Sequence, residues 1–189
     1  TAQSAVTILL RLHQITCGHL KKNDQVLPLK NNRVNEMLDV IEEMEGKVLI
    51  WAVYRHDIQA ITKILAEKYG PQSVRSFYGD TSDQERQEAI DLFKDDSSEL
   101  RFFVSNPRTG GYGLTFANCK NVIYYSNSYD LEVRLQSEDR THRIGQKNTC
   151  TYVDLICEKT VDEKIVHNLK NKITMSNKIL GEELKNWLV

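Results

Sequence analysis

The chain has 189 residues, a length that suits one well-packed domain rather than two, and its 40% hydrophobic and 27% charged residues are ordinary for a soluble globular protein. Its 25 Lys and Arg residues balance 26 Asp and Glu residues to a net charge of -1, so the charge gives no signature of a free-standing nucleic-acid-binding module. No apolar run approaches the roughly 20 residues that span a bilayer, and the N-terminus lacks a signal-peptide pattern. These features predict a cytoplasmic setting and no membrane partner.

The front of the chain is expected to form a helix and then a loop. Apolar residues at helical spacing predict a lead-in helix over about the first 20 residues. The apolar stripe of this helix, which must pack on something, consists of Ala5, Ile8, Leu9, Leu12 and Ile15. Residues 21–31 are rich in Lys, Asn and Asp and contain Pro28, which predicts a loop. A second helix then carries Met37 and Ile41 on its apolar face and ends near Gly46.

From Lys47 onward, short apolar runs alternate with amphipathic stretches, a pattern typical of βα units on a mostly parallel sheet. Strands are expected at 48–53, 74–77, 101–105, 122–125 and 151–156. Helices are expected at 57–68, 83–94 and 130–142. Capping-box patterns at Ser82 and Thr160 mark two helix starts. The sequence therefore predicts a single α/β domain over 1–189, with helices on both faces of the sheet, a front extension at 1–31 and C-terminal bracing helices at 160–189.

The cysteines and histidines do not indicate a metal site. The four cysteines form no CxxC pair and lie in or beside apolar segments, so reduced and buried thiols are expected. Cys17 and His19 lie close together, but no second ligand pair follows at a suitable spacing, and we predict no metal. His13 and His19 are expected to be structural or surface groups.

Three side chains near the end of the chain fall on one stripe of an expected helix. Gln136, Arg140 and Arg143 stand at i, i+4 and i+7, so they point in the same direction. Two guanidinium groups on one stripe can grip a triphosphate. Arginines near a helix C-terminus also complement the helix dipole, and Gly145 is an ordinary helix stop, so spacing alone leaves both interpretations open.

The run QSEDRTHRIGQ at 136–146 resembles motif VI of the superfamily-two helicases, specifically of the Swi/Snf branch of DNA translocases. Other segments resemble further parts of the same family, in the same order: LRLHQITCGH at 10–19, GKVLIW at 46–51, YGDTS at 78–82 with Arg86, TGGYGL at 109–114, and TVDEKI at 160–165. The resemblance covers nearly the whole chain. It implies the second, RecA-like (P-loop NTPase-like) lobe of an ATP-dependent double-stranded-DNA translocase or helicase.

The resemblance also implies roles for individual residues. Arg143 is the expected arginine finger, Arg140 assists it, and Gln136 links the nucleotide to DNA movement. Gly111 and Gly113, together with the two arginines, are the expected nucleotide-binding residues. The expected contacts with the DNA backbone are Tyr78, Gly79, Thr81, Ser82, Arg108, Thr109 and Gly110. Taken alone, the glycines are equally compatible with a tight turn, and 78–82 with a loop and helix cap.

The chemistry of a complete ATPase is not in this chain. A phosphate loop of the form GxxxxGK[ST] and an acidic pair after an apolar strand are both missing from the sequence. ATP and Mg²⁺ are therefore expected to be bound mainly by an N-terminal RecA-like lobe, and the chain alone is expected to be inactive. Duplex DNA and that lobe are the expected partners. The open alternative is a non-catalytic DNA- or protein-binding module that retains the lobe fold.

One segment departs from the family pattern. Where chromatin-remodelling members have DPxWNP, this chain has SNSYDL at 126–131, and Pro107 and Thr109 change the approach to the glycines. These departures favour a compact bacterial or phage member. Thr1 stands where an initiator Met would be, which suggests that the chain is truncated from a longer protein.

Overall fold

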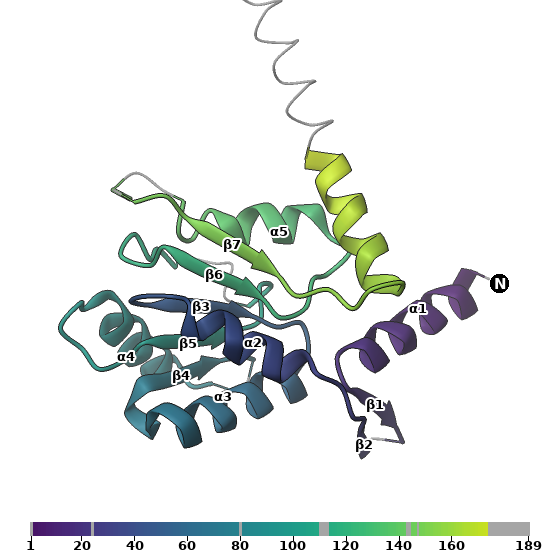
Figure 1. Ribbon diagram of the computed structural model, residues 1–189, viewed down its shortest axis with the longest axis horizontal. Helices are drawn as coiled ribbons and strands as arrows, with labels where there is room; N and C mark the ends of the chain where they lie inside the picture. The colour runs from purple at the N-terminus through teal and green to yellow at the C-terminus, as the bar shows by residue number, and fades with distance from the viewer. Residues whose placement is uncertain are drawn as a thin grey trace, which may run out of the picture.

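The computed structural model describes residues 2–23, 25–79, 81–109, 114–142, 145–146 and 148–173. Within these residues, five parallel strands form one sheet in the order β4-β5-β3-β6-β7 (Figure 1). The strands are β3 (Val48–Trp51), β4 (Val74–Phe77), β5 (Phe102–Ser105), β6 (Asn121–Tyr124) and β7 (Thr151–Asp154). All five fall where the sequence predicted strands, and the α/β class with a parallel sheet is confirmed.

Helices cover both faces of the sheet. They are α2 (Arg33–Glu42), α3 (Arg55–Tyr69), α4 (Asp83–Lys94) and α5 (Leu131–Glu138), with a short 3-10 turn, η1 (Pro71–Ser73), before β4. In strand β3, Val48 and Ile50 face the core shared with α2 and α3, while Leu49 and Trp51 face the core shared with α4. This alternation follows from the two-residue period of a strand. Because both faces are covered, β3 is apolar throughout, as expected of a central parallel strand.

The front of the chain differs from the expectation in one respect. After α1 (Ala2–Thr16), residues expected to form a loop instead form an antiparallel hairpin of β1 (His19–Lys22) and β2 (Gln25–Pro28). Asn23 takes a φ of 48° at the turn, a conformation that asparagine tolerates. All four residues of β2 are exposed, so the hairpin buries no apolar face along that strand. An apolar alternation, the usual sequence signal of a strand, was therefore lacking.

The lead-in helix α1 projects from the side of the domain (Figure 1). The sequence predicted that its apolar stripe must pack on something. In the structure Ile8 is 58% exposed, and Leu12 and Ile15 are each 45% exposed. The structure thus confirms the helix and leaves most of its stripe in contact with solvent.

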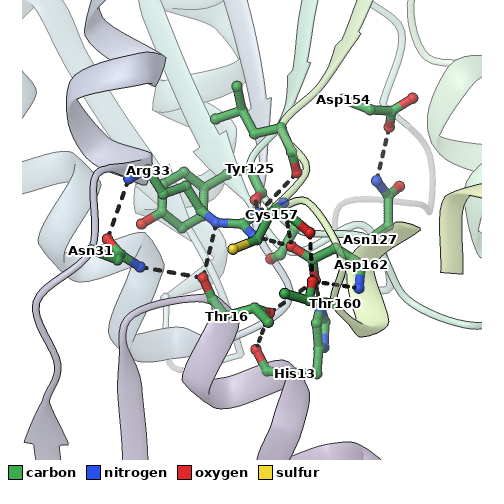
Figure 2. A network of polar contacts seen from close by, with 12 residues as sticks. His13, Thr16, Asn31, Arg33, Tyr125, Asn127, Asp154, Cys157, Thr160 and Asp162 are labelled. Atoms are coloured by element: carbon green, nitrogen blue, oxygen red, sulfur yellow. Dashed lines mark hydrogen bonds and ion pairs between the residues drawn. The ribbon is translucent and has the colours of Figure 1, made fainter. Parts of the chain in front are cut away.

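A buried polar network fastens α1 and α2 to a helix at residues 161–173, here called the closing helix (Figure 2). Arg33 and Asp162 form a buried ion pair, and the Nη1 of Arg33 also donates to the carbonyl of Leu155 over 3.0 Å. The hydroxyl of Thr16 donates to Asp162 over 2.9 Å. His13 lies 3.8 Å from the same carboxylate, and its other ring nitrogen contacts the hydroxyl of Tyr54 at 2.9 Å. This network connects elements at the two ends of the described chain.

The structure corrects part of the expectation for the cysteines. Cys17 and Cys119 are buried, as predicted, and burial raises the pKa of the Cys119 thiol to about 12. Cys157 is exposed, because it lies in the irregular segment between β7 and the closing helix rather than on a packed strand.

No helix in the described parts of the chain is long and apolar enough to cross a membrane.

The burial of His13 predicts a loss of stability in acid. Burial lowers the pKa of His13 from 6.5 to about 4, with Arg33 and His19 adding to this effect and Asp162 opposing it. The folded-state pKa lies below the unfolded-state value, so the unfolded chain binds more protons between these two pH values. Stability that is present above pH 6.5 is therefore expected to fall as the pH approaches 4, by up to roughly 3 kcal/mol.

Urea denaturation of the chain at about pH 7 and about pH 4.5 measures this effect, with His13→Gln as the matched variant. The variant is expected to be less stable at neutral pH and to lose less stability on acidification. An identical loss in both proteins would assign the acid sensitivity to other groups.

Candidate nucleotide and DNA interface

The predicted DNA-binding residues begin two neighbouring loops at one edge of the sheet. Strands β4 and β5 are parallel neighbours, and Phe77 at the end of β4 pairs with Ser105 at the end of β5. The segments at 78–82 and 106–109 therefore both leave the carboxyl edge of the sheet side by side. Loops at this edge form the usual ligand-binding crevice of open α/β folds.

The first loop is built by local hydrogen bonds. The backbone N-H of Tyr78 donates to the hydroxyl of Thr81, and the N-H of Thr81 donates to the carbonyl of Tyr78. Ser82 then caps α4 through the predicted capping box, in which Glu85 Oε2 accepts from the N-H of Ser82 over 3.1 Å. Gly79 and Ser82 are exposed. The loop therefore presents hydroxyls and backbone to solvent in a fixed shape.

The second loop is fastened across the edge to its neighbours. Asn106 donates to the carbonyl of Val53 over 2.6 Å and accepts from the N-H of Arg108 over 2.8 Å. The hydroxyl of Thr109 donates to the carbonyl of Asn106. The side chain of Arg108 is 66% exposed, and its guanidinium lies 3.1 Å from the carboxylate of Asp130, the N-cap of α5. An exposed pair of this kind is worth at most about 1 kcal/mol, so a phosphate can replace Asp130 at little cost.

Arg55 is a positively charged neighbour of these loops that sequence reasoning missed. It begins α3, just after β3, and its guanidinium lies 5.1 Å from the centre of the Tyr78 ring. Because α3 starts at the carboxyl edge of the sheet, Arg55 shares that edge with Arg108. Its position directly after an apolar strand was the available sequence signal for this edge, but none of the family motifs named above includes Arg55.

Arg140 joins the segment that follows the glycine run to the end of α5. Its Nη1 donates to the carbonyl of Leu114 over 3.0 Å, and its own carbonyl accepts from the N-H of Phe116 over 2.7 Å. Leu114 and Phe116 are buried, so this end of the segment is fixed in the core. The structure thus brings the predicted motif V and motif VI segments into direct contact.

The helical stripe predicted for Gln136, Arg140 and Arg143 is not one continuous helix. We expected a helix over 130–142, whereas α5 ends at Glu138, with Asp139 as its C-cap. The next residues form tighter turns, since the N-H of Thr141 donates to the carbonyl of Glu138 three residues earlier. The Nε of Arg140 turns back to the carbonyl of Gln136 over 2.7 Å. Gln136 itself donates to Glu132 over 2.9 Å.

Four of the predicted site residues lie outside the described residues. They are Gly110, Gly111, Gly113 and Arg143. Their predicted roles remain predictions. The described residues on either side of each gap, Thr109 with Leu114 and His142 with Gly145, belong to the two segments discussed above.

A hollow of about 690 Å³ adjoins Gln136 at the end of α5 and the start of β7. Its described lining includes Glu138, Asp139, His142 and Tyr152, and it contains no lysine or arginine among the residues that the structure describes. Within the described lining, the two carboxylates would repel a triphosphate.

Arg134 is the central polar residue of α5, and sequence reasoning missed it. Its guanidinium pairs with Glu138 at 2.6 Å and with Asp154, and it stacks 3.5 Å from the centre of the Tyr124 ring. The spacing of Arg134 and Glu138, four residues apart on a helix, was the available signal. These contacts hold α5 against β6 and β7, and so fix the helix that leads to Arg140.

The parallel sheet, its flanking helices and the loops at its carboxyl edge define the class of protein: a RecA-like α/β lobe. A solved structure described as the C-terminal part of the Fun30 ATPase domain has the same fold, with a TM-score of 0.67 and 23% identity; the match covers 74% of this chain and 46% of that one. The family model for the helicase conserved C-terminal domain matches residues 29–145. The chain belongs to this family.

Curated relatives agree with the Swi/Snf resemblance. The mouse protein named SWI/SNF-related matrix-associated actin-dependent regulator of chromatin subfamily A member 1 is 37% identical over 104 residues, which are 55% of this chain and 10% of the mouse protein. The Arabidopsis thaliana protein named CHROMATIN REMODELING 19 is 28% identical over 181 residues, or 90% of this chain and 23% of its own length. The yeast ISWI chromatin-remodeling complex ATPase ISW2 is 31% identical over 104 residues. The chain thus spans between 10% and 23% of the length of the mouse and Arabidopsis proteins.

Proposed function

We propose that this chain is the C-terminal lobe of an ATP-dependent translocase or helicase of the Swi/Snf type that moves along double-stranded DNA. An N-terminal RecA-like lobe holds ATP and Mg²⁺, and this lobe completes the site and part of the DNA contact. The chain alone is inactive as an ATPase. The observation that carries the proposal is the direct contact of Arg140 with Leu114 and Phe116 inside a chain of the helicase C-terminal family.

That contact supports a mechanical role. The segment at 106–116 begins at the carboxyl edge, where it carries Arg108, and its last described residues contact Arg140. In the proposal, a shift of Arg140 moves Leu114 and Phe116, which it contacts directly. In the proposal, Arg143 reaches the γ-phosphate on the opposite lobe and neutralises charge as it develops. Arg140 and Gln136 position the segment that carries Arg143.

Sequence-independent contact with the DNA backbone is assigned to the carboxyl-edge loops. Backbone N-H groups, hydroxyls and arginines are the usual phosphate contacts, and they carry no sequence information. Tyr78, Gly79, Thr81 and Ser82 lie in one loop, and Arg108 and Thr109 in the next. We extend the predicted set by Arg55, which lies over the ring of Tyr78.

The names of the relatives support an ATP-driven activity on chromatin. One is a chromatin-remodeling complex ATPase, and another is a chromatin remodeling protein. The relatives described above come from mouse, Arabidopsis and yeast, so they do not support the expected compact bacterial or phage parent in the cytoplasm.

The DNA contact is tested with Arg108→Ala in a longer polypeptide that contains this chain and the first lobe. The variant is expected to require severalfold more duplex DNA for half-maximal stimulation of ATP hydrolysis, and the salt dependence of DNA binding should fall by about one charge. The rate at saturating DNA should change little, because Arg108 is assigned to DNA and not to the nucleotide.

Lys63→Ala is the matched control, since Lys63 lies on α3 with 77% of its side chain exposed and pairs only weakly with Glu67 at 3.9 Å. If both variants bind DNA as the wild type does, Arg108 is not a phosphate contact. A wild-type protein that binds DNA without hydrolysing ATP would favour the non-catalytic binding module.

A further inference from the structure

Three potential metal ligands meet where the hairpin of β1 and β2 contacts the start of α3, next to Arg55. His19 is the first residue of β1, and His56 and Asp57 lie in the first turn of α3. One ligand atom from each residue lies within 4.8 Å of the others. His19 is 2% exposed and Asp57 is 3% exposed, while His56 is half-buried. The chain thus places two imidazoles and one carboxylate around one point.

The contact between His19 and Asp57 is close but poorly directed for a hydrogen bond. Nδ1 of His19 lies 3.0 Å from Oδ1 of Asp57. Within the described residues, His19 Nδ1 and Asp57 Oδ2 are both buried, and neither atom has a hydrogen-bond partner. Buried polar atoms of this kind cost free energy unless something else satisfies them. A cation bound between the two side chains would accept a lone pair from each of these two atoms.

The spacing suits a small tetrahedral ion. Zinc bonds to imidazole nitrogen and carboxylate oxygen are about 2.0 to 2.2 Å long, so tetrahedral geometry separates the ligand atoms by about 3.4 Å. The observed separations, 3.0 Å between His19 Nδ1 and Asp57 Oδ1 and no more than 4.8 Å within the set, bracket this value.

The ligand types favour zinc over calcium or magnesium. Imidazole is a ligand for first-row transition metals, whereas calcium and magnesium prefer oxygen alone. The ring of Tyr54 packs 4.9 Å from the ring of His19 and shields one side of the cluster. Half-buried His56 leaves a route to solvent, where a water molecule can take the fourth position.

We propose that His19, His56 and Asp57 bind a zinc-type divalent ion that fastens the front hairpin to α3. This site was not predicted from the sequence, because His19 and Asp57 stand far apart in the chain and only folding brings them together. The argument for this metal site does not depend on the proposed roles in ATP hydrolysis and DNA binding. It assigns the ion a structural role, because it crosslinks two elements on the outside of the sheet.

Metal binding is measured on the metal-free, tag-free chain by titration with Co²⁺, followed by competition with Zn²⁺. Tetrahedral Co²⁺ gives visible absorption bands that bound Zn²⁺ removes. We expect one ion per chain, a rise in melting temperature on addition of Zn²⁺, and at least tenfold weaker binding in His56→Ala and Asp57→Asn. His167→Ala is the matched control, because His167 is exposed on the closing helix.

His56→Ala is the decisive variant if Asp57→Asn fails to fold, because His56 is only half-buried and its loss need not disturb the core. Absence of the Co²⁺ bands in the wild-type chain would overturn the proposal. Equal Zn²⁺ affinity in the wild type and in folded His56→Ala, checked by circular dichroism, would also overturn it. The cluster would then be a buried histidine-carboxylate pair.

Discussion

Replacing Arg143 by alanine in a polypeptide that contains both lobes is expected to lower the maximal rate of DNA-stimulated ATP hydrolysis by roughly 10³-fold or more. The physical reason is the loss of a guanidinium that neutralises charge on the γ-phosphoryl group in the transition state. The ground-state affinity for ATP should change much less, since a finger of this kind acts mainly on the transition state. Steady-state hydrolysis and equilibrium nucleotide binding, measured on the same preparation, separate the two effects.

Two further variants sharpen this test. Arg143→Lys keeps the positive charge and loses the planar fork, so it should recover only part of the rate. His142→Ala changes the exposed neighbouring side chain and should leave the rate near that of the wild type. Turnover that survives Arg143→Ala would remove the finger assignment.

Replacing Arg33 by methionine is expected to lower the free energy of unfolding by about 3 to 5 kcal/mol, the usual cost of removing one partner of a buried ion pair. Arg33 is 7% exposed and Asp162 is 4% exposed, so the carboxylate would stay buried without its counter-ion. The carbonyl of Leu155 would also lose a donor at 3.0 Å. Urea denaturation of the chain at neutral pH measures the change.

The double variant Arg33→Met with Asp162→Asn tests the cause. If the unpaired charge dominates, the double variant should be more stable than Arg33→Met alone. Lys63→Ala removes one member of an exposed pair with Glu67, and it should change stability by less than about 0.5 kcal/mol. Equal effects of Arg33→Met and Lys63→Ala would mean that the network in Figure 2 contributes little.

The sequence was sufficient for the sheet because its strands have local signals. The run from Val48 to Trp51 is apolar without alternation, and the structure buries all four residues between two helical layers. The capping box at Ser82 fixed the start of α4 for a similar reason, because its hydrogen bonds lie within one turn. The end of α5 was harder to predict, since the final turns depend on contacts between Arg140 and a segment over 20 residues earlier, at Leu114.

The buried polar contacts could not be predicted from the sequence, because they join residues that are far apart in the chain. Arg33 and Asp162 are 129 residues apart in the sequence, so no local pattern links them. His19 and Asp57 meet only because the front hairpin packs against the start of α3. The second strand of the hairpin, β2, is exposed throughout, so the sequence lacks the apolar alternation that would predict it. In contrast, the loops proposed to contact DNA were predicted from family motifs, and the structure shows that Tyr78 and Arg108 follow neighbouring strands at one edge of the sheet.

The proposed division of the ATP site between two lobes is the central claim, and one measurement tests it most directly. ATP hydrolysis is recorded with and without duplex DNA, for this chain alone and for a longer polypeptide that adds the N-terminal lobe. We predict no turnover by the chain alone and DNA-stimulated turnover by the longer polypeptide. Hydrolysis by the chain alone, or a longer polypeptide that never hydrolyses ATP, would contradict the proposal.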